Sequence, residues 1–325
     1  MGRELPFAFH ANALAVGGLF TKPRREVISS EGSMVLAPTG GGGSVTVENY
    51  NYRNLITCDL IVSSVTGNFD DDGVYRTAAT VQLAHFNAFN VIRASLIQAT
   101  VFSEHRREDH KRNDDSHISF RAQFLGLTIN NVPVEPELDL DLYNQHPTYD
   151  ALRRALGDRR DLRQTLAHVD ENHTLRSSLI RGMSKECDNG KRGLQRDNFM
   201  VKVQGFGRVY LGEVLVKKGR RRLNMIRVEL DPSVTVPGGG IDQPGRDRIA
   251  GGDIDLRRHD GIVADPALAG NAMPPAGFGG APGAIPPALG NLQPRSLMAD
   301  AAGADGSEGS TTIGTCETNG ADFLP

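Results

Sequence analysis

The chain has 325 residues, of which 39% are hydrophobic and 6% aromatic, and it contains no tryptophan. Its formal net charge is −3. The low aromatic content argues against a protein that stacks bases or sugars on aromatic side chains. The small net charge gives the whole chain no attraction to nucleic acid or to anionic membranes. No stretch approaches the roughly 20 apolar residues of a membrane-spanning helix. We therefore expect no nucleic-acid partner and no membrane span.

The first 23 residues are mildly apolar, but His10 and Asn12 interrupt the run, so no secretory signal peptide is evident. Apolar residues alternate instead at Phe7, Phe9 and Ala11, which predicts an opening β-strand. Two further strands are predicted over residues 25–38 and 43–54. The glycine-rich stretch 39–44 between them predicts a flexible loop.

An internal echo organises the next part of the chain. Residues 54–65 align without gaps to residues 90–101, an offset of 36, with the asparagine, isoleucine, Leu-Ile and valine positions matched. Each copy runs into a polar turn and then into another strand-like piece. The simplest account is two related hairpins in a single sheet, because strand-like runs separated by turn residues pair most easily with their sequence neighbours.

The second half of the chain changes character twice. From 148 to about 183, leucines spaced four apart predict a small helical insertion, with Asp150 as a candidate N-cap. Residues 199–230 predict three more strands, with the basic run 217–222 at a hairpin tip. After Asp231 the sequence is rich in Gly, Pro and Ala, which predicts a tail that buries little apolar surface.

The predicted fold class is therefore mainly β: an antiparallel β-sandwich-like domain with a small helical insertion and a Gly/Pro-rich C-terminal tail. The domain spans residues 1–264 and includes the insertion over about 148–183, with one short strand at 252–264 returning to the sheet. Residues 265–325 form the low-complexity tail.

The best candidate for a metal site lies in 103–117. His105, Asp109, His110 and His117 combine imidazole and carboxylate groups that can hold zinc or another divalent cation. The alternative is a solvated hairpin tip, because four Arg and Lys residues share the same stretch. No cofactor can be named.

Other motifs point to structure rather than chemistry. The acidic run 68–73 fits a hairpin turn with Gly73 in a left-handed conformation, or a surface calcium site. No nucleophile elbow or phosphate-binding loop occurs in the sequence. Cys58, Cys187 and Cys316 predict no disulfide; each is a buried small residue or, in the case of Cys316, an exposed reactive thiol.

The phrase Gly-Leu-Thr-Ile-Asn-Asn-Val-Pro-Val at 126–134 and the strand pair at 207–230 resemble the bacterial choice-of-anchor type of surface β-domain. The similar stretches run over about 7–135 and 199–264. The resemblance implies an extracellular or cell-surface, non-catalytic domain with an unknown ligand. It carries over no functional residue, and the predicted helical insertion is a departure from it.

These observations favour a non-catalytic structural or adhesive surface protein, whose partner is another copy or a cell surface. It would self-associate or attach through its strand edges and its C-terminal tail. Two alternatives stay open: a metal-dependent enzyme that uses the 105–117 cluster, and a ligand-binding β-module that uses loops at one end of the sandwich.

Overall fold

The computed structural model describes residues 7–20, 26–106, 117–158, 174–184, 193–197, 199–217, 220–231 and 310–319. All of them belong to the first of two units into which the chain divides. The second unit, 239–294, lies outside the described residues, as does the strand predicted at 252–264.

The first of two large antiparallel sheets has eight strands. Its order is β13 (Leu194–Asp197), β14 (Met200–Val203), β15 (Gly207–Lys217), β16 (Arg220–Leu230), β17 (Ser310–Asn319), β1 (Ala11–Phe20) and β2 (Glu26–Val35), and β11 (Leu175–Ser178) also pairs with β15. The predicted strands at 25–38 and 199–230 are thereby confirmed.

The second large sheet has seven strands. Its order is β3 (Gly41–Tyr52), β4 (Ile56–Phe69), β5 (Val74–Ala88), β6 (Ile92–Arg106), β8 (Thr128–Ile129) and β9 (Val132–Pro133), and β7 (His117–Leu125) also pairs with β6. A small sheet of β10 (Pro136–Leu138) and β12 (Ile180–Met183) accompanies α1 (Leu140–Gln145) and α2 (Tyr149–Asp158).

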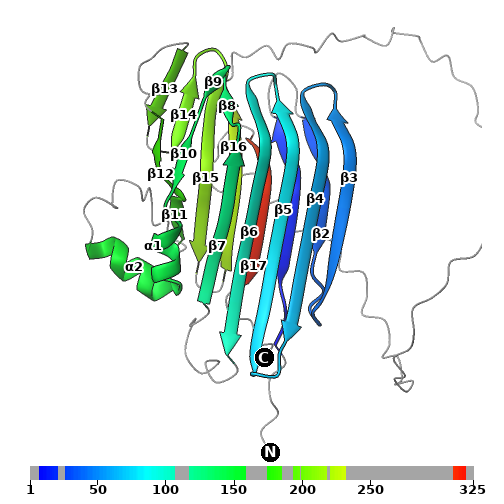
Figure 1. Ribbon diagram of the computed structural model, residues 1–325, viewed down its shortest axis with the longest axis vertical. Helices are drawn as coiled ribbons and strands as arrows, with labels where there is room; N and C mark the ends of the chain where they lie inside the picture. Colours follow the sequence, from blue (N-terminus) through cyan, green and yellow to red (C-terminus); the bar gives the residue numbers. More distant parts are fainter. Residues whose placement is uncertain are drawn as a thin grey trace, which may run out of the picture. The chain divides into compact units, whose positions relative to one another are not determined.

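The two large sheets pack face to face as a sandwich (Figure 1). Strands β17, β1 and β16 of one sheet contact β4, β5 and β6 of the other. Alternate side chains from both inner faces form one apolar cluster, which includes Ile61, Leu83, Ile97 and Ile313. The predicted mainly β, sandwich-like fold is confirmed.

The internal echo corresponds to two equivalent strands. β4 and β6 lie on either side of β5 in the same sheet. A tight turn precedes each of them, with positive φ at Arg53 and Asn54 before β4 and at Phe89 and Asn90 before β6. Such turns match the right-handed twist of the flanking strands. The prediction of two related hairpins in a single sheet is confirmed.

In each large sheet, the pairing registers align a row of residues across the strands. In every second strand, the residue of this row has a positive φ. In the eight-stranded sheet these residues are Gly212, Gly314 and Gly32, which the pairing registers place at one level. A Cβ on Gly32 would approach Ile61 Cγ2 to 2.6 Å, and one on Gly314 would approach the Met225 side chain to 3.1 Å. These positions therefore favour glycine on both backbone and packing grounds.

The equivalent row in the seven-stranded sheet contains Asn49, His85 and Gly126. The alternation of buried and exposed residues changes phase at this row. In β5 the odd-numbered residues from Thr77 to Leu83 are buried before it, and Phe86 and Ala88 are buried after it. Both echo copies carry a Leu-Ile pair next to this row, and the isoleucine of each pair, Ile61 or Ile97, is fully buried.

The C-terminal region requires a correction. Residues 310–319, predicted as part of a low-complexity tail over 265–325, form β17 between β16 and β1. This segment escaped prediction because it has few apolar residues; its outward side chains are Thr and Glu, which meet buried polar partners. Cys316 is fully buried there and is not an exposed thiol. Residues 265–309 lie outside the described part.

The helical prediction over 148–183 holds only in part. Helix α2 begins at Tyr149. Its N-cap is Thr148, which accepts a hydrogen bond from Ala151 N at Oγ1 (3.2 Å); the predicted N-cap, Asp150, lies instead in the first turn. Residues 174–183 were predicted to be helical but form β11 and β12, because Leu175 and Leu179 bury against β15 rather than along one helix face. The glycine-rich stretch is likewise not all loop, since Gly41 begins β3.

Candidate functional site

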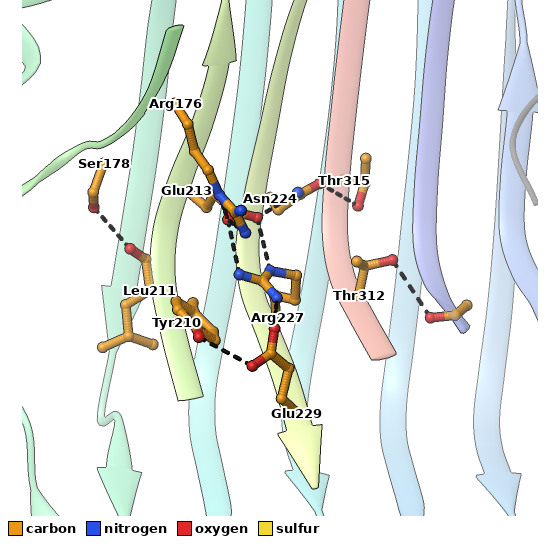
Figure 2. A network of polar contacts seen from close by, with 11 residues as sticks. Arg176, Ser178, Tyr210, Leu211, Glu213, Asn224, Arg227, Glu229, Thr312 and Thr315 are labelled. Carbon is orange, nitrogen blue, oxygen red and sulfur yellow. Dashed lines mark hydrogen bonds and ion pairs between the residues drawn. The ribbon is translucent and has the colours of Figure 1, made fainter. Parts of the chain in front are cut away.

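A cluster of charged side chains lies on the outer face of the eight-stranded sheet, the face opposite Cys316 (Figure 2). Cys316 Sγ points inward, toward Ala99 O of β6. Glu213 on β15 and Asn224 on β16 point outward at the same level. Arg227 follows farther along β16 and points to the same side. Glu213 is 1% exposed and Arg227 6%, which is unusual for charged residues.

Glu213 is the centre of this cluster. Arg227 binds it in a forked geometry, with Nε donating to Oε2 (3.0 Å) and Nη2 to Oε1 (3.1 Å). Arg176 Nε donates to Oε1 (2.8 Å) from β11, and Asn224 Nδ2 donates to Oε2 (3.1 Å). Both carboxylate oxygens therefore accept several hydrogen bonds, which is what a charge buried this deeply requires.

Arg227 connects the cluster to Glu229, which lies two residues farther along β16. It forms an ion pair with Glu229, and Tyr210 OH donates to Glu229 Oε2 (3.0 Å). The guanidinium carbon of Arg227 lies 3.8 Å from the centre of the Tyr210 ring, which adds a cation–π contact. Thr315 Oγ1 donates to Asn224 Oδ1 (3.0 Å) and so connects the cluster to β17.

The electrostatics of Glu213 favour its ionised form. Burial alone raises the pKa of Glu213, but the charges of Arg227 and Arg176 outweigh it and lower the pKa below the usual value. A general acid or base needs a pKa near the working pH and room for a substrate. Glu213 is fully paired and ionised, so the cluster serves to tie β11, β15, β16 and β17 together.

A second buried carboxylate lies on β17 itself. Glu317 has no exposed surface and faces Arg220 and Arg222 of β16; Arg222 Nε lies 2.6 Å from Glu317 Oε2. His10 Nε2 lies 3.2 Å from Oε1. Burial raises the pKa of Glu317, but the contact with His10 and the charges of Arg222 and Arg220 outweigh it and lower the pKa to about 2.

The four predicted metal ligands are only partly described. His105 is buried on the inner face of β6, where Nε2 lies 3.1 Å from Ser103 Oγ. His117 is exposed and pairs in register with Glu104, on the opposite face of the sheet from His105. Asp109 and His110 lie outside the described residues. Within the residues that the structure describes, no group of three His, Cys, Asp or Glu side chains could hold a metal ion.

Two other sequence predictions can be located. Gly73 adopts positive φ at the tip of the β4–β5 hairpin, as predicted, and Arg76 forms an ion pair with Asp70 of the same turn. Burial raises the pKa of the Cys58 thiol to about 11, which makes it a poor nucleophile. Neither of the two described helices is long and apolar enough to cross a membrane.

The edges of the two sheets differ sharply between the two sides of the sandwich. On one side the edge strands are β3, with 12 residues, and β2, with 10. On the other side they are β13 and β11, with four residues each, β9, with two, and β7, with nine, which also contacts α1. In the described part of the chain, β3 pairs only with β4, so its other edge is open. Glu48 is its single charged residue.

Sequence reasoning predicted the strands that carry the buried cluster but not the cluster itself. In the sequence, Glu213, Arg227 and Glu317 look like ordinary surface charges. Their neighbouring residues do not show which charged side chains the strand pairing brings together. One available signal was the single charge inside an otherwise uncharged stretch, as at Glu213 within 209–216.

We predict that Glu213→Gln lowers the free energy of unfolding by about 3 kcal/mol or more, because it leaves the buried Arg227 charge facing a neutral amide. The matched control is Glu104→Gln, which removes an exposed carboxylate paired with Arg76 and costs less than about 1 kcal/mol. Urea unfolding monitored by circular dichroism measures both. Equal losses for the two variants would contradict a stabilising role for the buried cluster.

We also predict loss of stability in acid. Because the folded pKa of Glu317 lies below its usual value near 4.5, its stabilisation is present above pH 4.5 and is lost as the pH falls toward about 2. Glu317→Gln should flatten this part of the pH–stability curve, whatever its effect at neutral pH. An unchanged slope between pH 4.5 and 2 in the variant would show that Glu317 is not the titrating group.

Comparison with known proteins gives one match. A family model described as a domain of unknown function (DUF8256) covers residues 7–178, which is 172 of the 325 residues. No curated protein and no solved structure matches the chain. The matched range contains the whole seven-stranded sheet, whereas β13 to β17 of the other sheet follow it. The chain therefore belongs to the DUF8256 family of domains.

Proposed function

We propose that this protein is a non-catalytic structural protein whose copies associate through the open edge of β3. The observation that carries the proposal is the length and neutrality of that edge. Natural sheet proteins usually protect an edge with short strands, lysines, prolines or bulges, because unpaired backbone groups are a template for another strand. Residues 41–47 of β3 carry no charge and no proline.

The side chains of β3 also permit a second backbone to approach. Gly41 and Gly42 are exposed, and a Cβ on Gly42 would find no atom closer than 3.4 Å. Glycine inside a strand often marks a place where another backbone comes close. Ser44 and Thr46 are exposed on the outer face and are small.

The expected partner is a second copy in antiparallel orientation, related by a two-fold axis. Pairing residues 41–48 of two copies places each Glu48 opposite glycine at the other end of the partner strand, so the two carboxylates do not face each other. The long edges β2 and β3 lie on the same side of the sandwich, so the second sheet approaches the partner as well. The cell-surface location implied by the choice-of-anchor resemblance stays a prediction.

The test is a pair of lysines on the edge. Ser44→Lys/Thr46→Lys should leave the fold intact, since both positions are exposed, and should abolish dimers detected by light scattering in the wild-type protein. The control Gln123→Lys/Gln195→Lys adds the same charge to exposed positions on β7 and β13, away from this edge, and should still dimerise. A wild-type protein that is monomeric at high concentration, or a control that loses its dimers equally, would overturn the proposal.

A further inference from the structure

We infer that the slot between β1 and β16 accepts β17 from a second copy of this chain as well as from its own. A chain whose own Ser310–Asn319 strand fits its slot keeps that strand, whereas two chains with mismatched strands exchange them. This inference extends the proposed self-association to a second, separate contact. It rests on the pairing of β17 and on the length of the chain that precedes it.

The connection to β17 is much longer than its position requires. Glu229 of β16 and Ser310 of β17 are partners in register, so the two strands form an antiparallel hairpin. A two-residue turn can close such a hairpin. The chain instead places 79 residues, 231–309, between the end of β16 and the start of β17.

Seventy-nine residues can reach a neighbouring molecule. A fully extended chain spans at most about 3.3–3.6 Å per residue, or roughly 260–280 Å over this length. Strand β16 has 11 residues and is therefore about 37 Å long. The number of residues in the connection is therefore sufficient for β17 to reach the slot of a neighbouring chain.

The described side-chain contacts of β17 are also independent of the connection. Glu317 binds Arg220 and Arg222, Thr315 donates to Asn224, and Thr312 Oγ1 donates to Gly17 O (3.4 Å). The backbone of β17 pairs with β1 on one side and β16 on the other. A strand supplied by a second copy makes the same contacts, so exchange sacrifices none of them.

The charge pair at Glu317 provides a test with full-length chains. One chain carries Glu317→Arg, which places three arginines together in its own slot; the other carries Arg222→Glu, which places two carboxylates together. Each chain's strand matches the other chain's slot. Both chains also carry Ser44→Lys/Thr46→Lys, so that edge pairing does not contribute, and they bear different affinity tags.

After joint unfolding and refolding, we expect the two chains to co-purify in equal amounts, with a mass twice the 35.1 kDa of one chain. The control chain, which combines Glu317→Arg and Arg222→Glu with the same edge lysines, restores the pair internally and should remain monomeric. If either single variant does not fold alone, the readout becomes recovery of its strand signal in circular dichroism upon mixing.

The inference is overturned if the control chain folds but the mixture neither co-purifies nor recovers strand signal. This outcome is separable from failure of edge pairing, because dimers of the wild-type chain that depend on Ser44 and Thr46 would persist. Conversely, exchange in the mixture together with a monomeric wild-type protein would support β17 exchange and refute the proposed edge contact.

Discussion

The architecture depends on the pairing of β17 between β16 and β1. These two neighbours come from opposite ends of the first 230 residues, and the described residues offer no other strand that joins them. Without β17, the β1–β2 hairpin and the β13–β16 part of the sheet would each present an open edge, and the inner face would lose Ile313 and Cys316 from the core. The last strand in the sequence therefore completes the central part of its sheet.

The eight-stranded sheet buries two carboxylates, Glu213 on β15 and Glu317 on β17. Burying a carboxylate is unfavourable unless several donors surround it. Glu317 and Glu213 both meet this condition through arginines on neighbouring strands, and Asn224 links Thr315 of β17 to Glu213. Such networks favour one register over others, because a strand shifted by one residue would bring each charge to the wrong face. The network therefore opposes a shift of register as well as tying the strands together.

Most of the strands could be predicted from the sequence. The echo of 54–65 in 90–101 identified β4 and β6, because period-two alternation and matched Asn turns are local signals. The rows of residues with positive φ were harder to predict. Each strand shows only a Leu-Ile pair or a single glycine at this point, and the row is recognised only when several strands are aligned. The buried cluster could not be predicted, because Arg176, Glu213 and Arg227 are distant in sequence and meet only through strand pairing.

The proposed function depends on the open edge of β3, and the further inference depends on the pairing of β17 between β16 and β1. Hydrogen exchange of the backbone amides in residues 310–319 tests this pairing most directly. If β17 is the central strand of the sheet, its amides exchange as slowly as those of β16 and β1, through global unfolding. Exchange at the rate of an unstructured peptide, with β16 still protected, would show that the sheet forms without β17 and would contradict the account.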